Sequence, residues 1–241
     1  MIKFSCEKVF LQNAIAVTSR AVAQKSSIPA LEGLLIHADQ QLTISGYNMQ
    51  TGIRTNVFAN VVEGGDIVLN ARLFGDIIRR LPEGYDTLLD DEKMMVHVSC
   101  GDADFDILGL SAADYPDLPE VEDEYAVSMQ QKVLRSMIEE VAFAVSTNES
   151  RPVHTGALFE IADMSLSMVA VDGFRLAFRR EKLEKLEGGA FSFVCPGSAL
   201  SEVKSICGDT EDLVTVTLGK RHILFEIGDT QLICRRLEGE F

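Results

Sequence analysis

Long apolar segments are absent from this 241-residue sequence. No window approaches the ~18 consecutive uncharged apolar residues that a membrane-spanning helix needs. The opening residues, MIKFSCEKVF, also lack the apolar core of a secretory signal peptide. Hydrophobic residues nevertheless make up 46% of the chain and charged residues 24%, a balance typical of folded proteins and not of disordered ones. We therefore expect a cytoplasmic protein that makes no membrane contact.

Cysteine is scarce and scattered. The five cysteines are odd in number, no two share a C-x-x-C spacing, and the four histidines do not cluster with them. This distribution predicts reduced thiols and no zinc site, and we expect no cofactor. The sequence also lacks the G-x-S-x-G, Walker and H-E-x-x-H motifs of common enzymes.

Acidic residues supply the main evidence for an enzyme. Asp102, Asp104 and Asp106 alternate in GDADFDI, so a strand would place all three on one face, where they could bind a metal ion. Asp90 and Asp91 form a second carboxylate pair. A solvated strand face, or a charged guard against pairing at a sheet edge, is the favoured explanation of the first three. We therefore predict no catalytic residues and no metal site.

Positive charge is in deficit. The balance of 22 Lys+Arg against 37 Asp+Glu gives a net charge of −15, which is unfavourable for nucleic-acid binding. The charge is uneven, however, because four segments with helical periodicity (7–22, 71–81, 130–145 and 198–207) sum to +3 and the remainder to −18. Such a protein could present a mildly basic helical face, although ordinary solvated helices would look the same. The cations of these segments are Lys8, Arg20, Arg72, Arg79, Arg80, Lys132, Arg135 and Lys204.

An internal repeat organises the chain. Apolar residues with helical spacing in 4–22 recur in 127–145 at an offset of 123 residues. Gly33 and Gly156 keep this offset, and two EGG motifs further along differ by 124. A nearly constant offset over more than a hundred residues indicates a duplicated domain.

Each copy has the pattern of a strand, an amphipathic helix, alternating strands, a second helix and further strands. The second helix spans 71–81 in copy one, where Pro82 and Gly84 end it, and about 198–207 in copy two. Clear period-2 alternation predicts strands at 95–100, 213–218 and 222–227.

The fold class is therefore α+β, with two tandem modules. Each module is expected to have two helices on one face and antiparallel sheet on the other. The modules span 1–120 and 126–241, and the acidic, proline-bearing stretch 114–125 contains the boundary.

The segment VAVDGFRLAF (169–178) joins two apolar runs through Asp172, Gly173 and Arg175. Asp-Gly between β-branched and aromatic flanks predicts a hairpin, because glycine tolerates a positive φ. The hairpin does not explain Arg175, which follows the turn.

Several motifs, in this order and at this spacing, resemble the bacterial DNA polymerase III beta subunit family of sliding clamps. They are GLLI and LTISGYN, LPEG, LSAADYPDLP (110–119), AVDGFRLA and the terminal RRLEGEF. The resemblance covers the whole chain and implies a clamp that encircles duplex DNA, confers processivity on the replicative polymerase and associates with the nucleoid. Family members have three modules, so it implies that the third is absent here and that the second is cut near its end.

In the family, the segment matching 171–176 lines a groove that captures short linear peptides of the DNA polymerase III alpha subunit, the clamp loader and other proteins with a clamp-binding motif. Arg175 would then give the groove wall a polar fork beside apolar pockets. Phe174 stands where histidine is common, and His154 stands where an aliphatic residue often lines the pocket. The groove residues implied by the resemblance are His154, Val171, Gly173, Phe174, Arg175 and Leu176.

The resemblance also implies a head-to-tail dimeric ring whose helices face DNA through charge and water, without reading bases. Lys25 and Asn148 match DNA-contacting positions, and Ser198 stands where a lysine is often found. Phe105 and Ile107 match the strand that closes the ring, although their spacing also suits ordinary core positions. We expect this two-module chain to be a monomer with both residues exposed.

A two-module regulator that binds a small molecule in the cleft between its modules is the alternative function. The discriminating observation is whether the protein binds a clamp-binding peptide or a metabolite.

Overall fold

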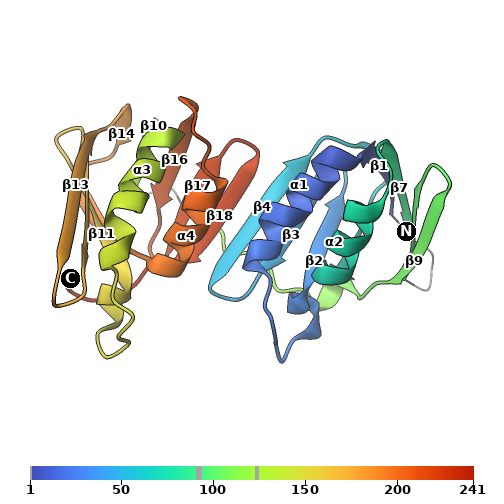
Figure 1. Ribbon diagram of the computed structural model, residues 1–241, viewed down its shortest axis with the longest axis horizontal. Coiled ribbons are helices and arrows are strands. Elements are labelled where there is room, and N and C mark those ends of the chain that lie inside the picture. Colours follow the sequence, from blue (N-terminus) through green and yellow to red (C-terminus); the bar gives the residue numbers. More distant parts are fainter. Residues whose placement is uncertain (1, 91–93, 123–124) are drawn as a thin grey trace. The chain divides into compact units, whose positions relative to one another are not determined.

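The computed structural model describes residues 2–90, 94–122 and 125–241. The chain divides into two compact units, Met1–Leu118 (unit 1) and Pro119–Phe241 (unit 2). Within the described residues, each unit combines two α-helices with antiparallel strands, which confirms the α+β class (Figure 1). The helices are α1 (Lys8–Thr18) and α2 (Ala71–Arg80) in unit 1, and α3 (Gln131–Val141) and α4 (Gly197–Ile206) in unit 2.

The strands of unit 1 pair in two orders, β5-β1-β7-β8-β9 and β4-β3-β2-β6. The first set comprises β1 (Lys3–Glu7), β5 (Asn60–Glu63), β7 (Tyr85–Asp90), β8 (Met95–Cys100) and β9 (Ala103–Leu108). The second set comprises β2 (Gly33–Ala38), β3 (Leu42–Tyr47), β4 (Thr51–Val57) and β6 (Gly65–Asn70).

Unit 2 repeats these orders as β14-β10-β16-β17-β18 and β13-β12-β11-β15. The predicted strands at 95–100, 213–218 and 222–227 are confirmed as β8, β16 and β17. The first set of unit 2 comprises β10 (Tyr125–Gln130), β14 (Lys185–Glu187), β16 (Leu213–Leu218), β17 (His222–Ile227) and β18 (Thr230–Arg235). The second set comprises β11 (Gly156–Ala162), β12 (Ser165–Val171), β13 (Leu176–Lys182) and β15 (Phe191–Pro196).

The first helix of each unit buries the same apolar stripe. In α1, Leu11 and Ile15 are buried, and Leu134 and Ile138 are their buried counterparts in α3, at the predicted offset. Residues three and four apart share one face of a helix, so this stripe turns toward the strands. Phe10, the residue beside the stripe in α1, is exposed.

The second helix of unit 1 has defined ends. The Asn70 side chain caps α2 by accepting a hydrogen bond of 3.0 Å from the backbone N–H of Leu73. At the other end, the buried Lys8 ammonium donates to the Leu81 carbonyl at 2.7 Å and forms an ion pair with Glu83. Lys8 therefore serves α2 as a buried C-terminal partner, and its inclusion in the basic helical face was wrong.

Membrane-spanning helices are not found among the described residues, because none of their helices is both long and apolar enough. All five cysteines are free thiols inside the protein. Burial raises the pKa of Cys207, to about 12, and that of Cys195 as well.

Candidate functional site

The β12–β13 hairpin forms the predicted tight turn. Val171 and Leu176 are the last paired residues of the two strands, and the turn between them closes with a hydrogen bond of 3.3 Å from the Asp172 N–H to the Arg175 carbonyl. Gly173 has φ +91°, a region that favours glycine. The Asp172 Oδ1 accepts hydrogen bonds from the backbone N–H groups of Phe174 (3.0 Å) and Arg175 (3.1 Å). The acid and the glycine of this segment therefore both serve the turn.

Arg175 is held by contacts on two sides. Its Nε donates to the Asp172 Oδ2 at 2.7 Å, and its guanidinium carbon lies 5.4 Å from the ring centroid of Phe143. Hydrogen bonds from the Phe174 N–H and the Arg175 side chain lower the pKa of Asp172. The guanidinium thus has a set orientation, and the Arg175 side chain is 55% exposed. Sequence reasoning missed Phe143; an apolar residue just past the buried stripe of α3 was the available signal.

Large apolar side chains surround Arg175 on the surface of unit 2. Phe174 at the turn is fully exposed, Leu176 is 64% exposed, and Phe178 is 56% exposed. Pairing places Phe178 opposite Val169, and Val169 opposite Leu158, so these residues share a sheet face with Val171 and Leu176. The residues that alternate with them, such as Met168 and Ala170, are fully buried on the opposite face. The hairpin therefore presents an apolar surface with one oriented guanidinium.

His154 belongs to a short 3-10 helix, Pro152–Thr155, that leads into β11. Its ring makes an edge contact with Phe241, with a centroid distance of 5.6 Å. Residues 236–241 also line a cavity of about 440 Å³ with Leu158 and Val194. The structure thus brings five of the predicted groove residues together at the hairpin and places His154 with the C-terminal segment.

Several predicted DNA-contacting cations are already paired. Lys132 lies 2.6 Å from Glu211, and its hydrogen bond lowers the pKa of that carboxyl group. Arg79 lies 3.2 Å from Asp76. These charges are neutralised locally, so they contribute less to the potential around their helices.

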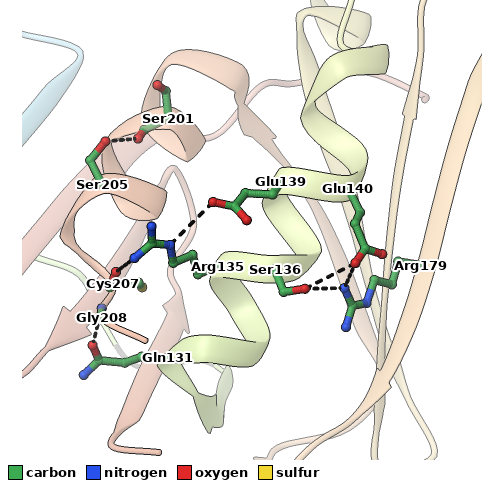
Figure 2. Close-up of polar contacts among 10 residues, drawn as sticks. All are labelled: Gln131, Arg135, Ser136, Glu139, Glu140, Arg179, Ser201, Ser205, Cys207 and Gly208. Atoms are coloured by element: carbon green, nitrogen blue, oxygen red, sulfur yellow. Dashed lines mark hydrogen bonds and ion pairs between the residues drawn. The ribbon is translucent and has the colours of Figure 1, made fainter. Parts of the chain in front are cut away.

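The α3 surface in unit 2 is an ion-pair network (Figure 2). Arg135 lies 3.5 Å from Glu139 and donates to the Cys207 carbonyl at 3.4 Å, which links α3 to the end of α4. On the other side, Arg179 reaches from β13 to pair with Glu140 and to donate to Ser136 at 2.6 Å. Both exposed acids of α3 are thereby matched by arginines.

Other predicted DNA contacts remain on the surface. Lys25, Arg72 and Arg80 are exposed, Lys204 is half-buried, and none of the four has an ion-pair partner in the part of the chain that the structure describes. Arg20 lies in a 3-10 turn after α1. Asn148 is exposed, and its Oδ1 accepts from the Ser150 N–H at 2.9 Å. The unpaired cations of the predicted DNA-contacting set are therefore concentrated in unit 1.

A groove between α1 and α2 lies beside these cations. It has a volume of about 710 Å³, and its walls include Gln12, Ser19, Arg72 and Arg79. Glu32, Asp76 and several apolar residues also line it, so the groove is mixed in charge and polarity.

Strand β9 places the predicted ring-closing residues differently from expectation. It is the last strand in its order, and Phe105 is 41% exposed on it. Ile107 is 1% exposed and belongs to the core of unit 1, so its predicted exposure was wrong. Val96 lies opposite Ile107 on β8 and is fully buried, so both side chains belong to the core of unit 1.

The described acidic candidates Asp102, Asp104 and Asp106 lie on strand β9 and the turn before it. The described residues contain no group of three or more His, Cys, Asp or Glu side chains that could hold a metal ion. Asp102, Asp104 and Asp106 are exposed, and Asp106 pairs with the imidazole of His97 across β8 and β9. The pair Asp90 and Asp91 lies outside the side chains that the structure describes.

Comparison with known proteins decides the family. The sequence profile of the DNA polymerase III beta subunit, N-terminal domain, matches residues 2–119, and that of the central domain matches residues 128–241. This chain belongs to the DNA polymerase III beta subunit family. The family's two domains thus follow one another along nearly the whole chain, one in each unit.

Family members with names and structures are similar over the full chain. A Beta sliding clamp of Staphylococcus epidermidis is 32% identical over 250 residues, with 100% of this chain and 66% of that protein covered. A crystal structure of a putative DNA polymerase III beta subunit from Eubacterium rectale shares 30% identity with a TM-score of 0.96, and a sliding clamp from Bacillus subtilis shares 29% with a TM-score of 0.95. The similarity extends over 100% of this chain and 66% of each of those structures, so the chain spans slightly less than two thirds of these relatives.

Proposed function

We propose that this chain supplies two modules of a DNA sliding clamp, a non-catalytic protein that encircles duplex DNA and confers processivity on the replicative polymerase. The observation that carries the proposal is the match to two consecutive domains of one family over residues 2–119 and 128–241. The relatives named as beta sliding clamps match this chain over its full length. The clamp would act in the cytoplasm at the nucleoid.

Exposed cations of unit 1 would contact the phosphates of duplex DNA. Lys25, Arg72 and Arg80 are exposed, whereas the whole chain carries a net charge of −15. Few phosphate contacts on an acidic protein imply weak, salt-sensitive binding without base recognition, so retention on DNA would depend on closure of the ring. Asn148 and the partly neutralised Arg79, Lys132 and Arg135 would add minor contacts.

Ring closure would require a second protein surface. β9 is an edge strand with the exposed Phe105, and such an edge can pair with a strand of another subunit. Head-to-tail closure joins two different surfaces of each subunit. We infer that the complementary surface lies in the part of the longer relatives that this chain does not cover. We also infer that the two-module chain is a monomer.

The hairpin of unit 2 would bind linear peptides of the DNA polymerase III alpha subunit, the clamp loader and other proteins with a clamp-binding motif. Phe174 and Leu176 supply exposed apolar area, and the oriented Arg175 supplies donors for a carbonyl or carboxylate. Peptide recognition of this kind combines apolar anchors with a few fixed polar groups.

A peptide titration tests the proposal. The probe is a fluorescein-labelled clamp-binding peptide from the alpha subunit, titrated with wild type, Leu176→Ala and Leu108→Ala. Leu108 is a matched control because it is 66% exposed, nearly as much as Leu176 at 64%, and lies in the other unit. We expect Leu176→Ala to weaken binding about 10-fold, the usual effect of losing an interface anchor, and Leu108→Ala to change it less than about twofold.

Equal binding by Leu176→Ala and wild type would contradict the groove. Binding of a metabolite without any peptide binding would instead support a small-molecule-binding regulator.

A further inference from the structure

The turn between β3 and β4 in unit 1 is the structural counterpart of the candidate hairpin. Asn48 Oδ1 accepts from the backbone N–H groups of Gln50 (3.0 Å) and Thr51 (2.8 Å), as Asp172 does in unit 2. The Asn48 N–H donates to the Thr51 carbonyl at 3.2 Å, and Met49 has φ +71° where unit 2 has Gly173. The two turns therefore align residue by residue.

This alignment gives counterparts for the groove residues. Tyr47 pairs with Gly52 next to the unit 1 turn, and Val171 pairs with Leu176 next to the unit 2 turn. Tyr47 and Gly52 are buried, whereas their counterparts Val171 and Leu176 are half-buried and largely exposed, respectively. The same sheet face is thus covered in unit 1 and open at the hairpin in unit 2.

Residues 110–118 cover the face in unit 1. The backbone of Leu110 exchanges two hydrogen bonds with Val68, of 2.8 and 3.1 Å. Tyr115 is buried in a cluster with Tyr47 and Val68, and its hydroxyl donates to the Ser45 carbonyl at 3.3 Å. Burial raises the pKa of Tyr115, as expected for a phenol enclosed by apolar groups.

Leu118 fills the space beside the turn. Its Cδ2 lies 2.9 Å from the position that a Cβ on Gly52 would occupy, and Tyr47 lines the same space. The absence of a side chain at Gly52 is therefore what admits Leu118. Tyr115 and Leu118 lie three positions apart in the stretch that follows the 3-10 turn Ala112–Asp114, and they occupy the face as a bound peptide would.

The C-terminal segment of unit 2 runs along the face equivalent to the one that residues 110–118 cover in unit 1, but over fewer residues. The Leu237 N–H donates to the Val194 carbonyl at 3.0 Å, as Leu110 does to Val68. Phe241 then contacts His154, whose counterpart in unit 1 is Leu31, a member of the Tyr115 cluster. Both units therefore receive a segment from their own C-terminal part on equivalent faces.

We propose that unit 1 carries a second linear-peptide site, formed by Tyr47, Gly52 and Val68 and filled in cis by residues 110–118. Its ligand class is an extended segment with an aromatic residue and a leucine at the spacing of Tyr115 and Leu118. The assignment of a peptide-binding role to this face rests on the proposed function of unit 2. A segment tethered in the same chain competes at an effective concentration of about millimolar, so unit 1 rejects other peptides.

The test uses the complete chain and a fluorescein-labelled peptide of its own sequence, LSAADYPDLP (110–119). The double variant Tyr115→Ala/Leu118→Ala weakens the covering segment, and its fold is checked by circular dichroism and melting. We expect the variant to bind one equivalent of the peptide at least about 10-fold more tightly than wild type does. A peptide with alanine in place of its tyrosine and leucine is the matched control and should not bind.

A folded double variant that binds the peptide no better than wild type would overturn the proposal, as would equal binding of the control peptide. If the double variant unfolds, Gly52→Leu replaces it, because a leucine there occupies the space of Leu118 and should displace it. Faster amide exchange of residues 110–118 is then expected without a gain of peptide binding, because the new leucine also fills the space that the peptide's leucine needs. Unchanged exchange, or a gain of peptide binding, would overturn the proposal. Failure of the proposed function would be distinguishable from these outcomes, because wild type would then not bind the alpha-subunit peptide.

Discussion

The side chain of Arg175 is bound to Asp172 through a 2.7 Å hydrogen bond, and its guanidinium stacks over Phe143 from another element. Asp172 thus has two functions, since one oxygen orders the turn and the other orients the arginine. This relationship separates the stability of the hairpin from its binding chemistry. Substitutions can therefore remove one function and leave the other.

The substitution Asp172→Asn should preserve the turn and release Arg175. Asparagine performs the same backbone role at Asn48 in unit 1, but it carries no charge to hold a guanidinium. Because the folded pKa of Asp172 is lowered, its ionised form stabilises the fold above the unfolded pKa of about 4, and this contribution is lost as the pH falls through the folded value. We expect a slightly lower melting temperature at neutral pH, because asparagine lacks this contribution, together with weaker binding of the alpha-subunit peptide. Full peptide affinity in Asp172→Asn would show that Arg175 needs no such partner.

The substitution Gly173→Ala should destabilise unit 2 by about 1 kcal/mol because φ at this position is +91°. No atom lies within 4 Å of a Cβ placed there, so the cost is conformational and not steric. Gly189→Ala is the matched control, since Gly189 has equal free space and no positive φ. Urea denaturation measures the free energy of unfolding of both variants. An equal loss in the two would refute the conformational explanation.

Removal of unpaired cations should weaken DNA binding more than removal of paired ones. We compare Arg72→Gln/Arg80→Gln with Lys132→Gln/Arg135→Gln, whose charges are matched by Glu211 and Glu139. In low salt, the first pair should lower the affinity for duplex DNA and reduce the salt slope by about 0.9 for each phosphate that the variant no longer neutralises. Equal effects of the two pairs, or binding that persists at high salt, would contradict the charge distribution.

Substitutions in the edge strand β9 should distinguish residues needed for assembly from residues needed for folding. Phe105→Glu places a charge on the surface and should leave the melting temperature nearly unchanged, whereas Ile107→Glu buries a charge and should cost at least about 3 kcal/mol. Light scattering should show a monomer for wild type and for Phe105→Glu. A tight wild-type dimer that Phe105→Glu dissociates would show that two modules suffice for assembly.

Acidification should destabilise unit 2 through His222. Burial, together with Arg235 and Arg221, lowers its pKa in the folded protein. The unfolded chain therefore binds a proton more readily, so stability is complete above about pH 6.5 and falls as the pH drops below that value. His222→Gln should lose less stability between pH 7 and pH 5.5 than wild type does. Parallel loss in both proteins would assign the acid sensitivity to other groups.

Local patterns in the sequence determined the repeat and most elements. The stripe of Leu11 and Ile15, its counterpart 123 residues later, and the Asp172-Gly173 turn were all predictable. Helical spacing, strand alternation and turn chemistry depend on neighbours a few residues apart, and these neighbours are visible in the sequence.

Only the tertiary structure decided which of these residues are available to a partner. Lys8 is buried against Leu81, and Lys132 is neutralised by Glu211, 79 positions away. Likewise, Ile107 is enclosed by the core, and Tyr115 covers Tyr47 from far along the chain. Charge pairing and burial depend on contacts between segments remote in sequence, so identical local patterns lead to an open face in one unit and a filled face in the other.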